Sequence, residues 1–168
     1  MGKVILITGG QRSGKSEEAE RRALSLSANP VYMATAHVWD EEFRQRIAQH
    51  QQRRGPQWTN IEEERHLSRH DLTGRVVLVD CITLWLTNLL YDLHDAEKAL
   101  AVAKEEFDRM TSQEATFIFV TNEIGLGGVS PDKLQRLFTD LQGRMNQHVA
   151  ATADEVILMV SGIAVKIK

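Results

Sequence analysis

Residues 9–16 read GGQRSGKS and directly follow the apolar run Val4-Ile5-Leu6-Ile7. Their spacing matches the pattern G-x-x-x-x-G-K-[ST] of phosphate-binding loops, which requires a strand before the loop and a helix after it. Glycines allow the backbone to turn successive N–H groups toward phosphate oxygens. The stretch therefore predicts a nucleotide-binding loop, formed by Gly9, Gly10, Gln11, Arg12, Ser13, Gly14, Lys15 and Ser16.

The end of this loop carries the groups that act on phosphates. In such loops the lysine reaches the β- and γ-phosphates and the hydroxyl residue ligates Mg²⁺, so we expect Lys15 to be catalytic and Ser16 to be a metal ligand. The helix that begins here adds the positive end of its dipole. The alternative is a glycine-rich turn whose lysine is merely solvated.

Short apolar runs alternate with longer helical segments along the chain. The runs are nearly continuous, as in parallel strands covered on both faces, and the segments between them are long enough for crossover helices. This layout predicts a single α/β domain over residues 1–168, P-loop NTPase-like (RecA-like), with a mostly parallel sheet and helices on both faces. The expected strands are 4–8, 31–35, 76–80, 116–121 and 155–160, with 163–168 as a hairpin partner of the last; the expected helices are 16–27, 40–54, 96–112 and 132–152.

Charge and composition argue against several partners. Of the 168 residues 26% are charged, and the formal net charge is −3, so the basic surface typical of nucleic-acid binding is missing. No apolar stretch approaches the roughly 18 residues of a membrane span, and no cationic leader begins the chain. We therefore expect a cytoplasmic protein without nucleic-acid partners or a membrane span. The single cysteine, Cys81, lies in an apolar stretch and is expected to pack rather than react.

Polar residues follow two of the expected strands. Asp80 ends the run 76–80, and Asn122 and Glu123 follow the run 116–121. Ligands bind outside the carboxyl ends of strands in open α/β sheets, so Asp80 is expected to hold Mg²⁺ there through water. Its alternative role is to cap the next helix. Asn122 and Glu123 face the same crevice, but a cap and a solvated acid explain them equally well.

The segment 39–55, WDEEFRQRIAQHQQRRG, begins like a helix, with Asp40 as N-cap and an acidic first turn. His50 lies on an otherwise apolar face of this helix, and a histidine in such a place is usually packed against its neighbours. Here, however, Arg53 and Arg54 offer donors suited to phosphate, and a neutral imidazole beside arginines can attack the α-phosphorus of a nucleotide. Residues three and four apart form one stripe of the helix, Trp39, Phe43, Ile47, His50 and Arg54.

Seven stretches together resemble the bifunctional adenosylcobinamide kinase / adenosylcobinamide-phosphate guanylyltransferase family of cobalamin biosynthesis. The phosphate loop alone is shared with many unrelated proteins, but the set is specific and runs nearly from end to end. The stretches are ITGGQRSGKS (7–16), VYMATA (31–36), RIAQHQQRR (46–54) with Trp58 and Glu62 beyond it, VDCITLWLTNLL (79–90), VTNEIGLGGV (120–129), LQGRMNQHVAATADEV (141–156) and VSGIAVKIK (160–168).

This resemblance implies two reactions. Members phosphorylate the aminopropanol hydroxyl of adenosylcobinamide with ATP or GTP, and then transfer GMP from GTP to that phosphate through a guanylylated histidine. Matching the family's segment implies His50 as the nucleophile, because this chain has Gln49-His50 where some members carry two histidines. The resemblance also implies Mg²⁺ as cofactor and a homotrimer. The further nucleotide contacts that it implies are Ala34, Thr35, Ala36, Gln51, Gln52, Arg53, Arg54, Glu62 and Asp80.

Two other functions remain open on the residues alone. A different small-molecule kinase with the same loop would use His50 structurally and form no covalent nucleotide intermediate. A nucleotide-gated switch would produce a conformational change rather than a product, and it would consume nucleotide without regard to a corrinoid.

Overall fold

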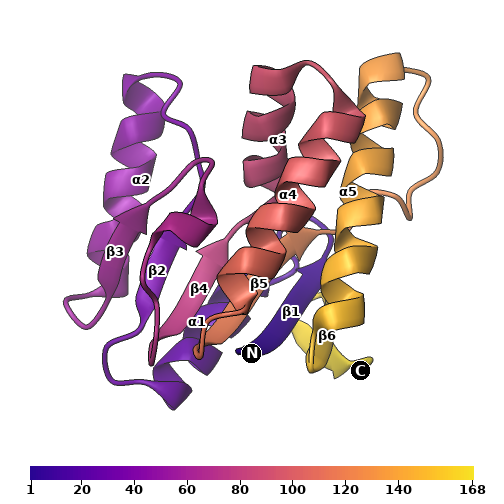
Figure 1. The fold of residues 1–168 in the computed structure, drawn as a ribbon. Helices are drawn as coiled ribbons and strands as arrows, with labels where there is room; N and C mark the ends of the chain where they lie inside the picture. Colours follow the sequence, from indigo (N-terminus) through magenta and orange to yellow (C-terminus); the bar gives the residue numbers. More distant parts are fainter.

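A seven-stranded sheet forms the centre of the computed structural model, which describes residues 1–168 (Figure 1). The strand order is β3-β2-β4-β5-β1-β6-β7, and every neighbouring pair is parallel except β6 with β7. The expected α/β class with a mostly parallel sheet is confirmed. The strands are β1 (Lys3–Gly9), β2 (Val31–Ala34), β3 (Thr59–Glu62), β4 (Val76–Asp80), β5 (Thr116–Asn122), β6 (Glu155–Val160) and β7 (Ile163–Lys166).

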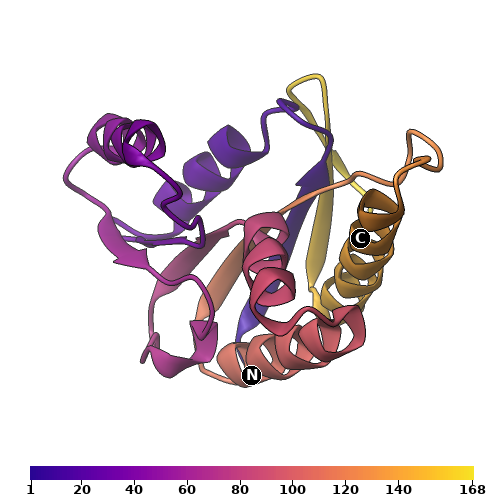
Figure 2. The same cartoon turned by 90° about the horizontal axis from the view of Figure 1, so that it is seen from above.

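Helices cover both faces of the sheet (Figure 2). One face is covered by α1, whereas α3, α4 and α5 lie on the other; α2 lies beside α1, beyond the β2–β3 side of the sheet. No helix is both long and apolar enough to cross a membrane. The helices are α1 (Lys15–Leu26), α2 (Glu41–Arg54), α3 (Ile82–Leu93), α4 (Ala96–Thr111) and α5 (Lys133–Thr152), with a short 3₁₀ helix η1 (Leu67–Arg69).

Successive side chains of the central strands enter opposite apolar layers. In β1, Val4 and Leu6 belong to a cluster of 24 buried residues shared with α3, α4 and α5. Ile5 and Ile7 belong to a second cluster of 12, which includes Ala19 of α1. Because both faces are covered, the strands contain apolar residues at consecutive positions.

Three elements were not predicted: α3, β3 and the short 3₁₀ helix η1. The stretch after Asp80 is mostly apolar and places Leu84 on the exposed side, which hides its helical period, although Ile82, Trp85, Leu86 and Leu89 are buried at the three- and four-residue spacing of a helix face. β3 is a four-residue edge strand that pairs only with β2 and has alternating burial. All the elements that were expected are present, and their ends lie within two residues of the predicted ones.

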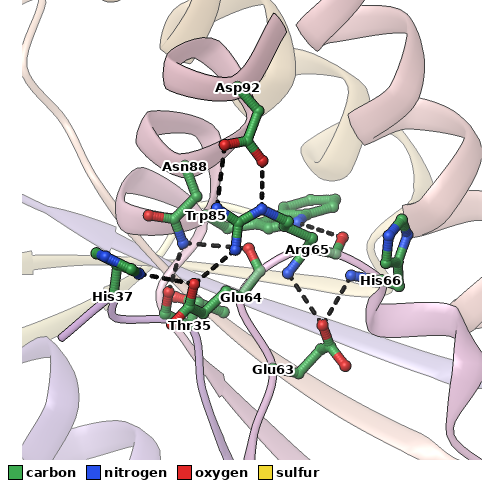
Figure 3. Close-up of polar contacts among 9 residues, drawn as sticks. All are labelled: Thr35, His37, Glu63, Glu64, Arg65, His66, Trp85, Asn88 and Asp92. Atoms are coloured by element: carbon green, nitrogen blue, oxygen red, sulfur yellow. Dashed lines mark hydrogen bonds and ion pairs between the residues drawn. The ribbon is translucent and has the colours of Figure 1, made fainter.

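Polar contacts hold the loops after β2 and β3 against α3 (Figure 3). The Glu64 carboxylate pairs with Nδ1 of His37 at 2.8 Å and accepts from Nη1 of Arg65 at 2.6 Å. Arg65 also forms a two-pronged pair with Asp92 of α3. Asn88 of α3 donates to the Glu64 carbonyl at 3.1 Å. The C-terminal edge of the sheet is thereby fastened to the outer part of α3.

Glu63 is the buried acid of this region, with 5% of its surface exposed. Its Oε1 accepts the backbone N–H groups of Arg65 at 3.0 Å and His66 at 2.9 Å, and its Oε2 pairs with Arg69 and His70. Burial raises the pKa of the Glu63 carboxyl, but these hydrogen bonds and the Arg69 charge outweigh it, so the pKa lies below the usual range.

We expect Glu63→Gln to lower the free energy of unfolding at pH 7 by about 2 kcal/mol, because an amide cannot accept the same set of hydrogen bonds. A carboxyl whose folded pKa is depressed contributes stability above its unfolded pKa of about 4.3, and this contribution is lost as the pH falls through the folded pKa. The free energy of unfolding, measured with urea, should therefore fall more in acid for the wild type than for the variant. The exposed neighbour Glu62, changed to Gln, is the control; coincident acid profiles for wild type and Glu63→Gln would contradict the expectation.

Candidate nucleotide-binding cleft

The parallel register places the functional loops at one edge of the sheet (Figure 1). Gly9 at the end of β1 lies opposite Asn122 at the end of β5, and Ala34 at the end of β2 lies opposite Asp80 at the end of β4. The glycine-rich loop, the β2–α2 loop and the first turn of α3 all leave the sheet at this edge. This is where open parallel sheets bind ligands.

The glycine-rich loop has the backbone that its sequence requires. Gly14, the N-cap of α1, has a φ of 93°, in the left-handed region that favours glycine. A Cβ on Gly9 would lie 2.7 Å from the Met159 carbonyl oxygen. In the β6–β7 turn, the N–H of Gly162 donates to the Ser13 carbonyl at 2.9 Å, so this turn supports the loop. Together they border a depression of about 610 Å³ that no hydrophobic residue lines. Its lining is Arg12, Ser13, Gly14, Lys15, Ser16, Glu17, Ser161 and Gly162.

Lys15 lies folded into the loop, with only 7% of its surface exposed. Its Nζ donates to the Gly10 carbonyl at 2.5 Å and to the Ser13 hydroxyl at 3.5 Å. Burial lowers the pKa of the ammonium, an effect that the charge of Asp80 partly offsets. The Lys15 ammonium is thus paired only with neutral acceptors, and an anionic phosphate oxygen would compensate its charge better.

Asp80 joins the glycine-rich loop to β2. Its Oδ2 accepts from the Ser16 hydroxyl at 3.1 Å and from the Tyr32 hydroxyl at 2.7 Å. Burial and the charge of Asp80 raise the pKa of Tyr32 well above its ordinary value, so the phenol remains a donor. Asp80 does not cap the next helix, since the N-cap of α3 is Cys81, whose sulfur accepts from the Leu84 N–H.

Cys81 is buried, as expected, and burial raises the pKa of its thiol to about 12. A thiol with this pKa stays protonated near neutral pH and is a poor nucleophile. The residue therefore packs and caps α3.

A second depression, of about 350 Å³, adjoins the first through Ser16. It lies between α1, the end of β2, α2 and the start of α3, and it brings His50 and Arg54 to the same space as Ser16 and Asp80. The expected site residues Ala34 and Ala36 also line it. The full lining is Ser16, Glu20, Tyr32, Ala34, Ala36, Phe43, Arg46, Ile47, His50, Arg54, Asp80 and Leu84. We call this space the cleft.

Arg54 is more deeply placed than a surface phosphate ligand would be. It is 8% exposed, and its guanidinium carbon lies 3.5 Å from the centre of the Tyr32 ring, a cation–π contact. Its Nη2 donates to Asn60 at 3.2 Å, while its buried Nε has no protein partner. Trp58 packs edge-on against Tyr32, with ring centroids 5.8 Å apart.

Several expected nucleotide contacts lie outside the cleft lining. Thr35 is fully buried, and its hydroxyl donates to the Cys81 carbonyl at 2.7 Å and accepts the Cys81 N–H at 2.8 Å, so its side chain fastens β2 to α3. Trp39 was expected on the stripe of α2, but it precedes the Asp40 N-cap and is 55% exposed. Gln51, Gln52 and Arg53, which follow His50 on other sides of the helix, and Glu62 at the exposed end of β3 also lie outside the lining. Of the expected loop residues, Gly9, Gly10 and Gln11 line neither depression.

Other cleft residues were not singled out from sequence. Arg46 lies one turn before His50, a spacing that places both on one helix face, so the helical period could have revealed it. Glu20 lies on α1 one turn after Ser16, and burial raises the pKa of its carboxyl. Tyr32 sits within an apolar strand, where no sequence pattern indicates its contact with Asp80.

The oxygen donors of the cleft suit a magnesium ion. Ser16 and Asp80 present a hydroxyl and a carboxylate 3.1 Å apart at the base of the phosphate loop, the donor types that Mg²⁺ takes beside substrate phosphates. No group of three or more His, Cys, Asp and Glu side chains able to hold a metal occurs in the chain. Fold and cleft together define a P-loop nucleotide-binding protein of the NTPase type.

Comparisons with known proteins specify the family. The family model for CobU, described as cobinamide kinase / cobinamide phosphate guanyltransferase, matches residues 5–167. The bifunctional adenosylcobalamin biosynthesis protein CobU of Escherichia coli (strain K12) is 40% identical, covering 98% of this chain and 99% of that protein. CobP of Pseudomonas aeruginosa is 39% identical over 97% and 96% of the two chains. The chain belongs to this family of cobalamin-biosynthesis enzymes.

The solved structures support the fold alone. A prototypical ATPase from the type III secretion system of pathogenic bacteria superposes with a TM-score of 0.59 at 12% identity, covering 99% of this chain and 57% of that one. A P-loop ATPase fold is therefore shared across very different sequences.

The Tyr32 hydroxyl offers a test of the cleft's construction. We expect Tyr32→Phe to lower the free energy of unfolding by about 1–2 kcal/mol, because Asp80 loses its shorter hydrogen bond while the ring stays under Arg54. Tyr91→Phe is the matched control, since Tyr91 is 62% exposed. Equal urea-unfolding midpoints for both variants would contradict the assigned contact.

Proposed function

We propose that this protein phosphorylates the aminopropanol hydroxyl of adenosylcobinamide, using ATP or GTP, and then transfers GMP from GTP to the new phosphate through a guanylylated His50. The observation that carries the proposal is the shared cleft: His50 of α2 lines the same space as Ser16 and Asp80 at the phosphate loop. Membership in the family supports both reactions. A kinase without a covalent intermediate would need no nucleophile in this space.

In the kinase step, the acceptor hydroxyl oxygen attacks the γ-phosphorus, the bond to the β–γ bridging oxygen breaks, and the nucleoside diphosphate leaves. The hydroxyl proton passes to water. Lys15 and the loop N–H groups stabilise the charge on the transferring group. Ser16 and Asp80 would hold Mg²⁺, which would supply further neutralisation of the phosphate charge.

The second reaction divides into two displacements. A neutral nitrogen of His50 attacks the α-phosphorus of GTP, a P–N bond forms and pyrophosphate leaves. An oxygen of adenosylcobinamide phosphate then attacks the same phosphorus and the P–N bond breaks, which restores the imidazole. Arg46 and Arg54 line the cleft together with His50, and a guanidinium group suits the charge on the α-phosphate.

In this proposal the phosphate loop serves both reactions, binding the donor's β- and γ-phosphates in the first and the pyrophosphate leaving group in the second. The remaining expected contacts, Ala34, Ala36, Gln51, Gln52, Arg53 and Glu62, would surround the guanine nucleotide, and Thr35 would position its neighbours. As the family resemblance implies, we propose a cytoplasmic homotrimer; its mass is measurable by sedimentation equilibrium.

His50→Ala should abolish labelling of the denatured chain by GTP that carries ³²P at the α-phosphate, while retaining most of the kinase activity. The reason is that only the second reaction uses the imidazole as a nucleophile. The wild-type label should be acid-labile and alkali-stable, as a phosphoramidate is. Gln49→Ala, one residue away on α2, should label like the wild type.

Lys15→Ala should damage both reactions, because both need charge stabilisation at the phosphate loop. Equal loss of the two activities in a folded His50→Ala protein would remove the nucleophile assignment. Wild-type protein that binds GTP and phosphorylates cobinamide without becoming labelled would be a kinase of another kind. Nucleotide consumption unaffected by a corrinoid would instead favour a switch.

A further inference from the structure

Four rings form an exposed aromatic ridge beyond the cleft, defined by His37, Trp39, Tyr91 and His94. The ring centroids of His37 and Trp39 are 4.5 Å apart, those of Trp39 and Tyr91 5.7 Å, and those of Tyr91 and His94 6.1 Å. The first two pairs are edge-to-face, the favourable geometry for aromatic pairs. Yet Trp39 and Tyr91 expose 55% and 62% of their surfaces. Such exposure of large aromatic rings in one place marks an interaction site.

The ridge is held in place rather than loosely attached. His37 pairs with Glu64, which is bonded to Arg65, and Arg65 forms a two-pronged pair with Asp92, the residue after Tyr91 (Figure 3). The loop that bears Trp39 and the helix that bears Tyr91 are therefore tied together below the exposed rings. A preorganised surface loses little conformational entropy when it binds a ligand.

The ridge also lies close to the cleft along the chain. Trp39 lies three residues after Ala36 and four before Phe43, both of which line the cleft. Tyr91 lies seven residues, two turns, after the cleft residue Leu84, so it projects from the same face of α3 about 10 Å farther along the axis.

The acceptor's size decides what the ridge can bind. A cleft of about 350 Å³ is near the lower limit for a drug-sized ligand, and the nucleotide must use it. A corrin macrocycle with its amide side chains and adenosyl group cannot enter as well, so only its hydroxyl-bearing arm can. The ring body needs an apolar surface within reach of the cleft.

The ridge and its surroundings match that chemistry. The rim of a corrin carries methyl groups, which pack on aromatic faces, and amides, which pair with imidazole nitrogens. Beyond Tyr91 and His94 the surface continues into an apolar groove of about 580 Å³ between α3 and α5, whose lining includes Leu90, Leu134 and Phe138.

We propose that the aromatic ridge is the docking surface for the corrin ring of the acceptor, with Trp39 and Tyr91 as its main contacts, while the aminopropanol arm reaches into the cleft. This inference rests on the proposed function, from which the acceptor is taken.

Equilibrium dialysis of the full-length protein against cobinamide, followed by its visible absorbance, tests the assignment. We expect Trp39→Ala and Tyr91→Ala each to weaken cobinamide binding about tenfold, through the lost apolar contact. GTP affinity and α-phosphate labelling at His50 should be unchanged, because neither residue lines the cleft. Leu26→Ala is the control: Leu26 is also exposed, but it lies at the end of α1 near the opposite edge of the sheet.

A second measurement separates docking from effects on the cleft. With a truncated acceptor, an N-acyl aminopropanol without the corrin, the wild type and the two variants should phosphorylate equally slowly. Unchanged cobinamide affinity in both variants overturns the ridge while leaving the proposed function intact. A changed oligomeric mass in sedimentation velocity, together with unchanged cobinamide affinity, also overturns it. The ridge would then be an interface between copies of the chain. Failure of the wild type to phosphorylate cobinamide at all overturns the proposed function instead.

Discussion

The parallel pairing of β1, β5, β4 and β2 is the constraint on which the cleft depends. In parallel neighbours the carboxyl ends lie side by side, so the glycine-rich loop after β1, Asp80 after β4 and the β2–α2 loop emerge at one edge. An antiparallel partner in any of these places would send its loop to the opposite edge. The two apolar layers hold this arrangement, because each strand must bury both of its faces.

Asp80 then links what the sheet brings together. It accepts hydrogen bonds from Ser16 on the loop side and Tyr32 on the sheet side, and the Tyr32 ring carries the guanidinium of Arg54. A contiguous path therefore runs from the phosphate loop to the helix that bears His50. The cleft is lined by the cationic residues Arg46 and Arg54 and by the acids Asp80 and Glu20, while Lys15 lies in the adjoining depression. This arrangement suits anionic phosphates accompanied by a metal ion.

The helix α2 is much less buried than the rest of the fold. Arg54 is its only buried residue, and Phe43 and Ile47 are half-buried. Few buried contacts give a segment a low free-energy cost of local opening. The position of His50 consequently depends on the Arg54–Tyr32 contact and on the loops at either end of the helix, of which the preceding one is tied to α3 by His37 and Glu64.

Local pattern in the sequence was sufficient for the phosphate loop, the parallel α/β class, most elements and the Asp40 cap of α2, because glycine spacing, apolar runs and capping residues act over a few neighbouring positions. It was insufficient for α3, whose mostly apolar sequence masks its period, and for β3, whose pairing with β2 is its main support. Only the tertiary structure decided that Tyr32 bonds Asp80, that Thr35 turns inward, that Trp39 leaves the helix stripe to meet Tyr91, and that Arg46 shares the cleft with His50. Some of these contacts join residues that are distant in the sequence, and others depend on which face of a helix meets its neighbours. Only the packing of the folded chain determines either.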